Sequence, residues 1–206
     1  MIVEVLTTIG MVFLWALWIM LPAYIPNPAA ALLGGGTPID FGKCAKDGRR
    51  IFGDGKTWRG LFGGIIVGII FGGIQIWARW FFHLDFLPEL TWVTVICLSI
   101  GALLGDLIKS YFKRRLGKDR GAKWPIADMY DMVVGSLGLM TIMLLITGNI
   151  GWFQTVFSAF SSGIVLDMGW GWALAAVLVA IIILSPLMHR SANIIGYMFK
   201  LKDVPW

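Results

Sequence analysis

The stretch that decides the fold of this chain is GDLIKSYFKRRLGKDRGAKWPIADMYD, from Gly105 to Asp131. It places seven Lys or Arg residues and four Asp residues between two long apolar segments. The apolar segments predict helices that cross a membrane, and the charged residues predict the polar surface at which those helices meet. So much charge in so hydrophobic a chain indicates a functional role for this stretch.

The composition of the whole chain predicts a membrane protein. Of 206 residues, 58% are hydrophobic and 14% are charged, and the mean hydropathy is +0.79. Because the charges are clustered, apolar runs of about twenty residues remain, which is enough to span a bilayer. We expect an all-α, polytopic membrane helix bundle that forms one membrane-embedded domain over residues 1–206. Its five expected transmembrane helices cover residues 2–23, 61–80, 90–108, 130–146 and 169–187.

The distribution of basic residues predicts the orientation in the membrane. Of the 17 Lys and Arg residues, 16 lie in the loops 26–59 and 109–127 or in the tail from residue 190. Five spans place these three regions on one side, and basic loops favour the cytoplasm. We therefore expect the N-terminus outside, the C-terminus in the cytoplasm, and an active site that faces the cytoplasm from a multi-pass protein of the cell membrane. Because the basic residues flank membrane helices, the net charge of +5 does not indicate nucleic-acid binding.

Local features complete the expected layout. Pro22, Pro26 and Pro28 are expected to break any continuous helix after the first span. Residues 149–168 are expected to form a loop with an interfacial turn. Cys44 lies in a polar loop and Cys97 in an apolar run, so no disulfide is expected. Glycines of the second and fourth spans are expected to allow close helix packing.

The first half of the charged stretch predicts a polar helix face. If the third span continues as a helix, spacings of three, four and seven residues put four polar side chains on one face where the helix leaves the membrane. These are Asp106, Lys109, Ser110 and Lys113.

The second half suggests a metal site. Asp128 and Asp131 are three residues apart at the start of the next helix, so their carboxylates project to one side. Two nearby carboxylates repel each other unless a cation lies between them, and Mg²⁺ commonly takes one or two carboxylates together with substrate phosphates. The alternative is an ordinary cytoplasmic loop with Asp128 as a helix N-cap. That alternative leaves Asp131 unexplained, because an ionisable residue costs about 2.5–3.5 kcal/mol at the centre of a membrane helix and less near its ends.

The first polar loop, from Gly34 to Gly60, is a candidate phosphate-binding segment. Its Gly-Asp-Gly-Lys-Thr at residues 53–57 resembles part of a P-loop, but that motif requires glycine where Arg50 stands. Glycines expose backbone N–H groups, and the cations at the mouth of the second span could hold phosphate oxygens. The alternative is a solvated basic loop that faces anionic lipid headgroups. The candidate binding residues in this loop are Lys56, Thr57 and Arg59.

The order of the polar residues resembles the signature region of the CTP-dependent phosphatidate cytidylyltransferases. The matching residues are Ser110, Lys113, Arg114, Lys118, Asp119, Pro125, Asp128 and Asp131. A His-Gly-Gly of that signature is missing, and Met129 stands where the family has arginine. These departures and the short chain resemble the archaeal branch, the CDP-archaeol synthases. The first polar loop is similar to that branch as well. The resemblance therefore implies that this loop forms a second wall of the active site, with Asp40, Lys43, Asp47 and Arg49 as further candidate members.

The resemblance implies an activity. It predicts CTP-dependent transfer of a cytidylyl group to an isoprenoid ether glycerol phosphate, 2,3-bis-O-geranylgeranyl-sn-glycerol 1-phosphate, with release of diphosphate. The expected cofactor is Mg²⁺ on Asp128 and Asp131, and the expected partners are CTP, the lipid phosphate and membrane lipids, with a homodimer left open. Asp128, Asp131 and Lys113 are the expected catalytic residues. The expected substrate-binding residues are Lys43, Asp54, Lys56, Thr57, Arg59, Asp106, Ser110 and Arg114.

Two other functions compete with this interpretation. A CDP-alcohol phosphotransferase also uses membrane carboxylates with Mg²⁺, but its motif has glycine after the second aspartate, where this chain has Met132. A transporter would be expected to place ionisable residues deep in its spans, often in repeated halves. The predicted spans carry Asp, Glu, Lys and Arg only near their ends, as at Asp106 and Asp131, which disfavours transport.

Overall fold

The structure, a computed structural model, describes residues 2–119, 122–163 and 169–198, and within these ranges every regular element is a helix. Five of the helical segments are long and apolar enough to cross a membrane, as predicted. Two isolated β-bridges, Pro38 with Thr57 and Cys44 with Arg50, lie in the first polar loop. The helices are α1 (Ile2–Tyr24), α2 (Pro26–Leu33), α3 (Trp58–Phe81), α4 (Trp92–Arg115), α5 (Pro125–Ile146), α6 (Trp152–Gly163) and α7 (Gly169–Met198).

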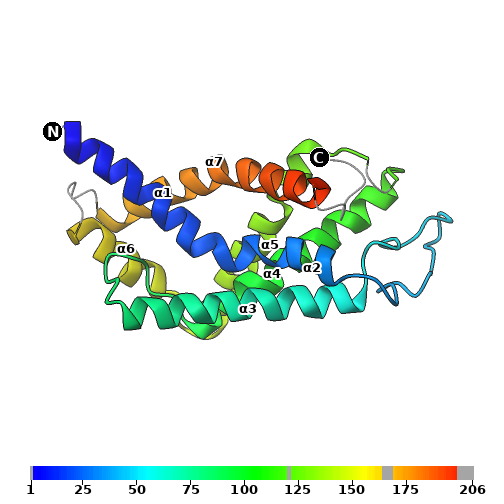
Figure 1. Ribbon diagram of the computed structural model, residues 1–206, viewed down its shortest axis with the longest axis horizontal. Coiled ribbons are helices and arrows are strands. Elements are labelled where there is room, and N and C mark those ends of the chain that lie inside the picture. Colours follow the sequence, from blue (N-terminus) through cyan, green and yellow to red (C-terminus); the bar gives the residue numbers. More distant parts are fainter. Residues whose placement is uncertain (1, 120–121, 164–168, 199–206) are drawn as a thin grey trace.

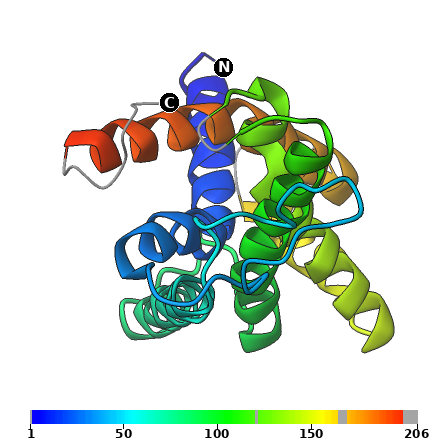
Figure 2. The same cartoon turned by 90° about the vertical axis from the view of Figure 1, so that its right-hand side faces the viewer.

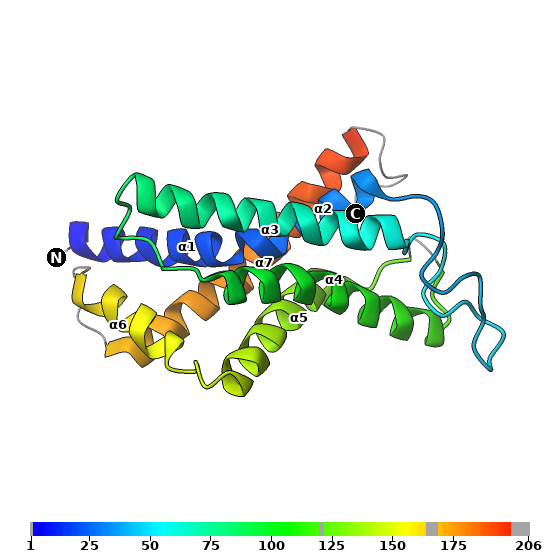
Figure 3. The same ribbon diagram turned by 90° about the horizontal axis from the view of Figure 1, so that it is seen from below.

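The bundle has two different ends. Figures 1 and 3 show the N-terminal end of α1 and the short helix α6 at one end of the long axis. The loop between α2 and α3 and the connection between α4 and α5 lie together at the other end. The two basic segments therefore share one end of the bundle, although which side of the membrane that end faces remains a prediction.

Two spans extend further into the charged stretch than predicted. Helix α4 continues to Arg115, and α5 already begins at Pro125, so only residues 116–124 connect them. The last turn of α4 contains three basic residues, Lys113, Arg114 and Arg115. Positive charge near its C-terminus stabilises a helix, which explains why α4 continues to this point. Proline is favoured at the first position of a helix, which explains why α5 begins at Pro125, before the predicted start of the span at residue 130. Helix α7 likewise continues past 187 to Met198, and the basic positions 200 and 202 lie outside the described residues.

The expectation that prolines break the first span is wrong for Pro22, which lies inside α1. A proline cannot donate to the carbonyl four residues earlier, so that carbonyl needs another donor inside a membrane. The Gln75 side chain donates to the Trp18 carbonyl at 2.9 Å, and Ser99 donates to the Pro22 carbonyl, freed by Pro26, at 3.1 Å. Neighbouring helices thus satisfy the carbonyls, and α2 follows α1 after one residue.

The loop expected at 149–168 is also wrong in part, because residues 152–163 form α6. Its Phe157 and Phe160 are fully buried against Trp15 of α1, with ring centroids 5.8 Å and 4.4 Å from the indole. Aromatic side chains with helical spacing thus make this segment an amphipathic helix that closes the core from the end opposite the basic loops.

Glycines bring helices α4 and α5 into backbone contact, as predicted. A Cβ on Gly101 or Gly135 would overlap with the backbone of the facing helix. Ser136 of α5 donates to the Leu98 carbonyl of α4 at 2.9 Å, which fixes the register of the pair. In α3, Gly64, Gly68 and Gly72 are buried against α2, Ser99 and Val95, which confirms the prediction for the second span.

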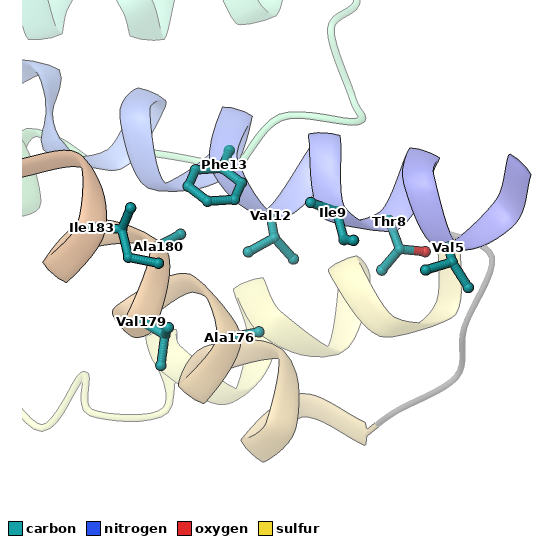
Figure 4. A pocket seen from close by; sticks show the side chains of 9 residues that line it. All are labelled: Val5, Thr8, Ile9, Val12, Phe13, Ala176, Val179, Ala180 and Ile183. Atoms are coloured by element: carbon teal, nitrogen blue, oxygen red, sulfur yellow. The ribbon is translucent and has the colours of Figure 1, made fainter. Parts of the chain in front are cut away.

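An apolar groove lies between α1 and α7, with a volume of about 360 Å³ (Figure 4). Val5 and Ile9 of α1 and Ala176 and Val179 of α7 are among its lining residues. The groove lies toward the N-terminal end of α1, far along the bundle from the basic loops (Figure 1). It is therefore separate from the polar site described next.

Candidate active site

The polar site forms where the last turns of α4 pass the first turns of α5. Gly105 lies against the backbone of Asp131, and an added Cβ would overlap with the Asp131 carbonyl. Asp106 follows Gly105 directly, so this close approach brings the carboxylates of two helices to one place. This backbone contact explains how Asp106 and Asp131, which are 25 positions apart in sequence, come to lie close together.

Lys109 is the centre of the site. Its ammonium nitrogen lies 3.2 Å from Asp106 Oδ1, 3.2 Å from Asp128 Oδ1 and 2.7 Å from Asp131 Oδ2. The side chain of Lys109 is 14% exposed and that of Asp131 only 4% exposed. Carboxylates this buried need partners, and the shared ammonium supplies them. We call Asp106, Lys109, Asp128 and Asp131 the carboxylate cluster.

Two further lysines border the carboxylate cluster. Lys56, at the end of the first polar loop, forms an ion pair with Asp106. Lys113, one turn beyond Lys109 on α4, lies 3.2 Å from Asp128 Oδ1. The predicted face of α4 and the predicted aspartate pair therefore meet, and the first polar loop contributes Lys56 as expected.

Asp128 has two roles. Its Oδ1 faces Lys109 and Lys113, while its Oδ2 accepts a hydrogen bond of 2.8 Å from the backbone N–H of Trp124. The alternative interpretation of Asp128 as N-cap is wrong, because Trp124 caps a helix that begins at Pro125. Asp128 nonetheless satisfies an N–H group at the helix start, and this bond fixes the carboxylate orientation.

The first polar loop folds around Asp40. This side chain is fully buried and accepts hydrogen bonds from the Arg50 guanidinium and from the backbone N–H groups of Gly42, Phe52 and Gly53. Burial alone would raise the pKa of Asp40, but these donors outweigh it and hold the pKa well below its usual range. The loop thus has a defined fold around a buried carboxylate and is not merely a solvated basic segment.

Arg115 docks this loop on the end of α4. Its guanidinium donates to Asp47 Oδ1 at 2.6 Å and to the Arg50 carbonyl at 2.6 Å. Arg49 of the loop reaches back to the Arg114 carbonyl at 3.5 Å. Figure 2 shows the loop crossing the end of the bundle in front of α4. These contacts place Lys56 beside the carboxylate cluster.

Other predicted binding residues have structural partners. Thr57 caps α3 by accepting from the Gly60 N–H at 3.1 Å, and Arg59 donates to the carbonyls of Leu33 and Gly34. These two residues tie α3 to the end of α2. Both are therefore occupied in shaping the loop.

Within the described part of the chain, the ion pairs given above for the carboxylate cluster involve none of the remaining predicted residues. Asp54 pairs with Arg50, and Arg114 donates to the Lys118 carbonyl at 2.6 Å. Lys43 is exposed on the loop, and Ser110 is buried on α4.

Lys109 is the site residue whose role sequence reasoning missed, and the structural role of Asp40 was missed as well. Helical spacing placed Lys109 on the polar face, but it matches no position of the resemblance and received no role. The resemblance makes Asp40 a candidate member of the active site, but an acidic residue among glycines and cations does not reveal that the loop folds around it. Both roles depend on contacts between segments far apart in sequence.

Comparison with known proteins identifies the family. A family model described as CarS-like, CDP-archaeol synthase, matches residues 8–161. The chain belongs to the CDP-archaeol synthase family. It is 68% identical to a CDP-archaeol synthase of Methanocorpusculum labreanum over 187 residues, which cover 91% of this chain and 100% of the relative. A CDP-archaeol synthase of Methanoculleus marisnigri is 50% identical over 189 residues, with the same coverage of both chains.

One solved structure is similar as well. It is that of an intramembrane enzyme for archaeal membrane lipid biosynthesis, and it is 30% identical to this chain. The match has a TM-score of 0.59 and covers 88% of this chain and 94% of the other. The similarity to CDP-archaeol synthases therefore extends over both basic segments and the helices that hold the carboxylate cluster.

The donor set of the cluster suits a hard divalent cation. Among the described residues, no group of three or more His, Cys, Asp or Glu side chains is arranged to hold a metal ion as the side chains stand, and the Lys109 ammonium lies between the three aspartates. Carboxylate oxygens are nevertheless the ligands that Mg²⁺ prefers. Asp106, Asp128 and Asp131 therefore have the donor atoms that such an ion requires, while in this structure the Lys109 ammonium occupies the space between them.

Proposed function

We propose that the carboxylate cluster is where this enzyme joins its two substrates. The chain is a CTP-dependent cytidylyltransferase that forms CDP-archaeol in archaeal membrane lipid synthesis, and it is a multi-pass membrane protein. The family assignment removes the transporter and CDP-alcohol phosphotransferase alternatives. The observation that supports the site is the meeting of three aspartates and three lysines from two helices and a loop at one end of the bundle.

The reaction requires two polyanions to meet. A phosphate oxygen of the lipid attacks the α-phosphorus of CTP and forms the new P–O bond, while the bond from that phosphorus to the bridging oxygen breaks and diphosphate leaves. The attacking oxygen is already anionic at neutral pH, so no general base is needed. The protein must therefore overcome electrostatic repulsion and align the substrates.

The lysines of the site supply positive charge for this task. Lys56 and Lys113 are proposed to bind phosphate oxygens, because each contacts one aspartate at the border of the cluster. Asp128 and Asp131, with Asp106 beside them, are proposed to hold Mg²⁺. When bound, Mg²⁺ orients the triphosphate and neutralises charge on the leaving diphosphate.

The orientation is part of the proposal. The end of the bundle that carries both basic segments is proposed to face the cytoplasm, where CTP is available, with the lipid phosphate at the level of the inner headgroups. The lipid chains would remain beside the helices. A homodimer stays a prediction.

The test is CTP-dependent diphosphate release by the purified enzyme with the ether-linked lipid phosphate and Mg²⁺. Asp128→Asn and Asp131→Asn keep the side-chain shape and remove the charge, and each is expected to lower turnover by about 100-fold or more, which corresponds to about 2.7 kcal/mol. The control is Asp85→Asn, because Asp85 is 80% exposed and pairs only with Arg79 in the loop between α3 and α4. Near-normal turnover of either cluster variant would refute the proposed metal role.

A further inference from the structure

The position of Lys109 raises a problem for the proposed metal site. Its ammonium lies within 3.2 Å of oxygens from all three aspartates. Of these three aspartates, Lys56 pairs with Asp106 and Lys113 with Asp128. The oxygens that would bind Mg²⁺ are the ones that bind Lys109. Because two cations repel each other at such distances, the ammonium and the metal compete for these oxygens.

The charge of the surrounding side chains shows why this arrangement is stable. Three lysines face three aspartates, so the site is close to neutral. Without Lys109, the buried Asp131 carboxylate would lie next to Asp106 and Asp128 with no cation between them. Unpaired buried charges are strongly unfavourable, so the lysine keeps the site folded when no metal is present.

The near-neutral charge of the site disfavours binding of the metal without CTP. A divalent ion that entered the neutral site by itself would bring two uncompensated positive charges. A metal that enters with the triphosphate of CTP brings negative charge as well, and that charge also attracts the displaced ammonium. Lysine suits this exchange, because its four-carbon stem lets the ammonium shift without movement of the helix backbone.

We propose that Lys109 is a placeholder cation, which occupies the metal position in the nucleotide-free enzyme and turns to the substrate phosphates when Mg²⁺ enters with CTP. This inference rests on the proposed function, because it assumes that the three aspartates bind the metal. It goes beyond that function in two ways. It gives Lys109 a role in both states, and it makes metal and nucleotide binding mutually dependent.

The experiment measures metal binding directly. Mn²⁺ is titrated into the purified full-length enzyme in detergent, with and without CTP and without lipid substrate, and free Mn²⁺ is followed by electron paramagnetic resonance. Wild type is expected to bind Mn²⁺ about tenfold or more tightly with CTP than without it. Lys109→Met is expected to bind Mn²⁺ without CTP about tenfold more tightly than wild type.

Lys113→Met is the matched control. It removes the same charge from the same helix one turn away, but Lys113 contacts only Asp128 and leaves the other aspartates with Lys109. A general loss of positive charge would strengthen Mn²⁺ binding in both variants alike. The placeholder role predicts a gain for Lys109→Met that clearly exceeds the gain for Lys113→Met.

The outcomes separate this inference from the proposed function. If wild type binds Mn²⁺ with CTP but Lys109→Met gains no more than Lys113→Met, the placeholder role is wrong and the metal site stands. The role is also wrong if wild type binds Mn²⁺ equally well without CTP. If no variant binds Mn²⁺ under any condition, both the proposed metal site and the placeholder role are wrong.

Misfolding of Lys109→Met would itself be informative. The placeholder role predicts that Mn²⁺ alone restores a monodisperse size-exclusion profile to this variant, because the metal takes the place of the missing ammonium. A variant that stays misfolded at saturating Mn²⁺ contradicts the role.

Discussion

Among single residues, Gly105 determines how closely α4 and α5 approach each other at the carboxylate cluster. We predict that Gly105→Ala lowers turnover by about tenfold or more. The added Cβ would overlap with the Asp131 carbonyl, so α5 must shift and carry Asp131 away from Asp106 and Lys109. CTP-dependent diphosphate release and thermal unfolding measure the effect.

Gly138→Ala provides the control on the neighbouring helix. No atom lies within 4 Å of a Cβ at this position, and alanine favours a helix over glycine by about 1 kcal/mol. This variant is expected to keep wild-type turnover and to be at least as stable as wild type. Equal losses in both variants would show that the contact at Gly105 has no special role.

Asp40 gives a second prediction at this scale, through the pH dependence of the first polar loop. Its pKa is below the value of about 3.9 of an unfolded chain, so its contribution to loop stability is complete above that pH. The contribution is lost as the pH falls through the lower, folded pKa. We therefore expect the loop to remain folded from neutral pH to below pH 4.

Asp40→Asn removes this contribution at every pH. At neutral pH we expect trypsin to cleave at Lys43 and Lys46 about tenfold faster than in wild type, which corresponds to about 1.4 kcal/mol of loop stability. Asp54→Asn is the matched control, because its side chain is 71% exposed and its loss leaves the Arg50 contact with Asp40 intact. Unchanged cleavage of the Asp40 variant would contradict the central place of this residue in the loop.

At the scale of helices, the turn that carries the aspartates is tied to a proline in α7. Pro186 cannot donate to the Ile182 carbonyl, and the Tyr130 hydroxyl donates to that oxygen at 3.0 Å. Tyr130 lies between Asp128 and Asp131 in sequence. We predict that Tyr130→Phe lowers the free energy of unfolding by about 1 kcal/mol, since the carbonyl then lacks a donor.

Pro186→Ala tests whether the Tyr130 hydroxyl matters because Pro186 leaves the Ile182 carbonyl without a backbone donor. Alanine restores a backbone N–H that can donate to Ile182, so the tyrosine hydroxyl becomes dispensable in this background. Thermal unfolding of the four combinations gives the coupling between the two positions. Strictly additive effects would mean that the hydroxyl acts elsewhere.

The presence of the membrane-spanning helices could be predicted from the sequence, because each is a continuous apolar run. Their close packing could be predicted as well, because glycines are spaced along the helices that pack. The same is true of the Asp128 and Asp131 pair and of the polar face of α4. The helix inside 149–168 and the continuation through Pro22 could not be predicted, because both depend on partners from distant segments. Lys109 was visible as a position on the face, but its contact with all three aspartates depends on the backbone approach of α4 to α5.

At the scale of the whole molecule, the two cysteines offer a test of orientation. Cys44 is exposed on the first polar loop, and Cys97 is buried in α4. We predict that a membrane-impermeant maleimide labels inside-out vesicles and spares sealed right-side-out vesicles. Cys44→Ser is the control that should abolish labelling. Labelling of right-side-out vesicles only would place the basic end outside the cell.

The central claim is that the aspartates of two adjacent helices form one cation site at the polar end of the bundle. The most direct measurement is the anomalous scattering of Mn²⁺ in crystals of the enzyme grown with CTP. We predict an anomalous peak coordinated by Asp128 and Asp131, with the Lys109 ammonium moved to the nucleotide phosphates. A peak bound elsewhere, with both aspartates still paired to Lys109, would contradict the account.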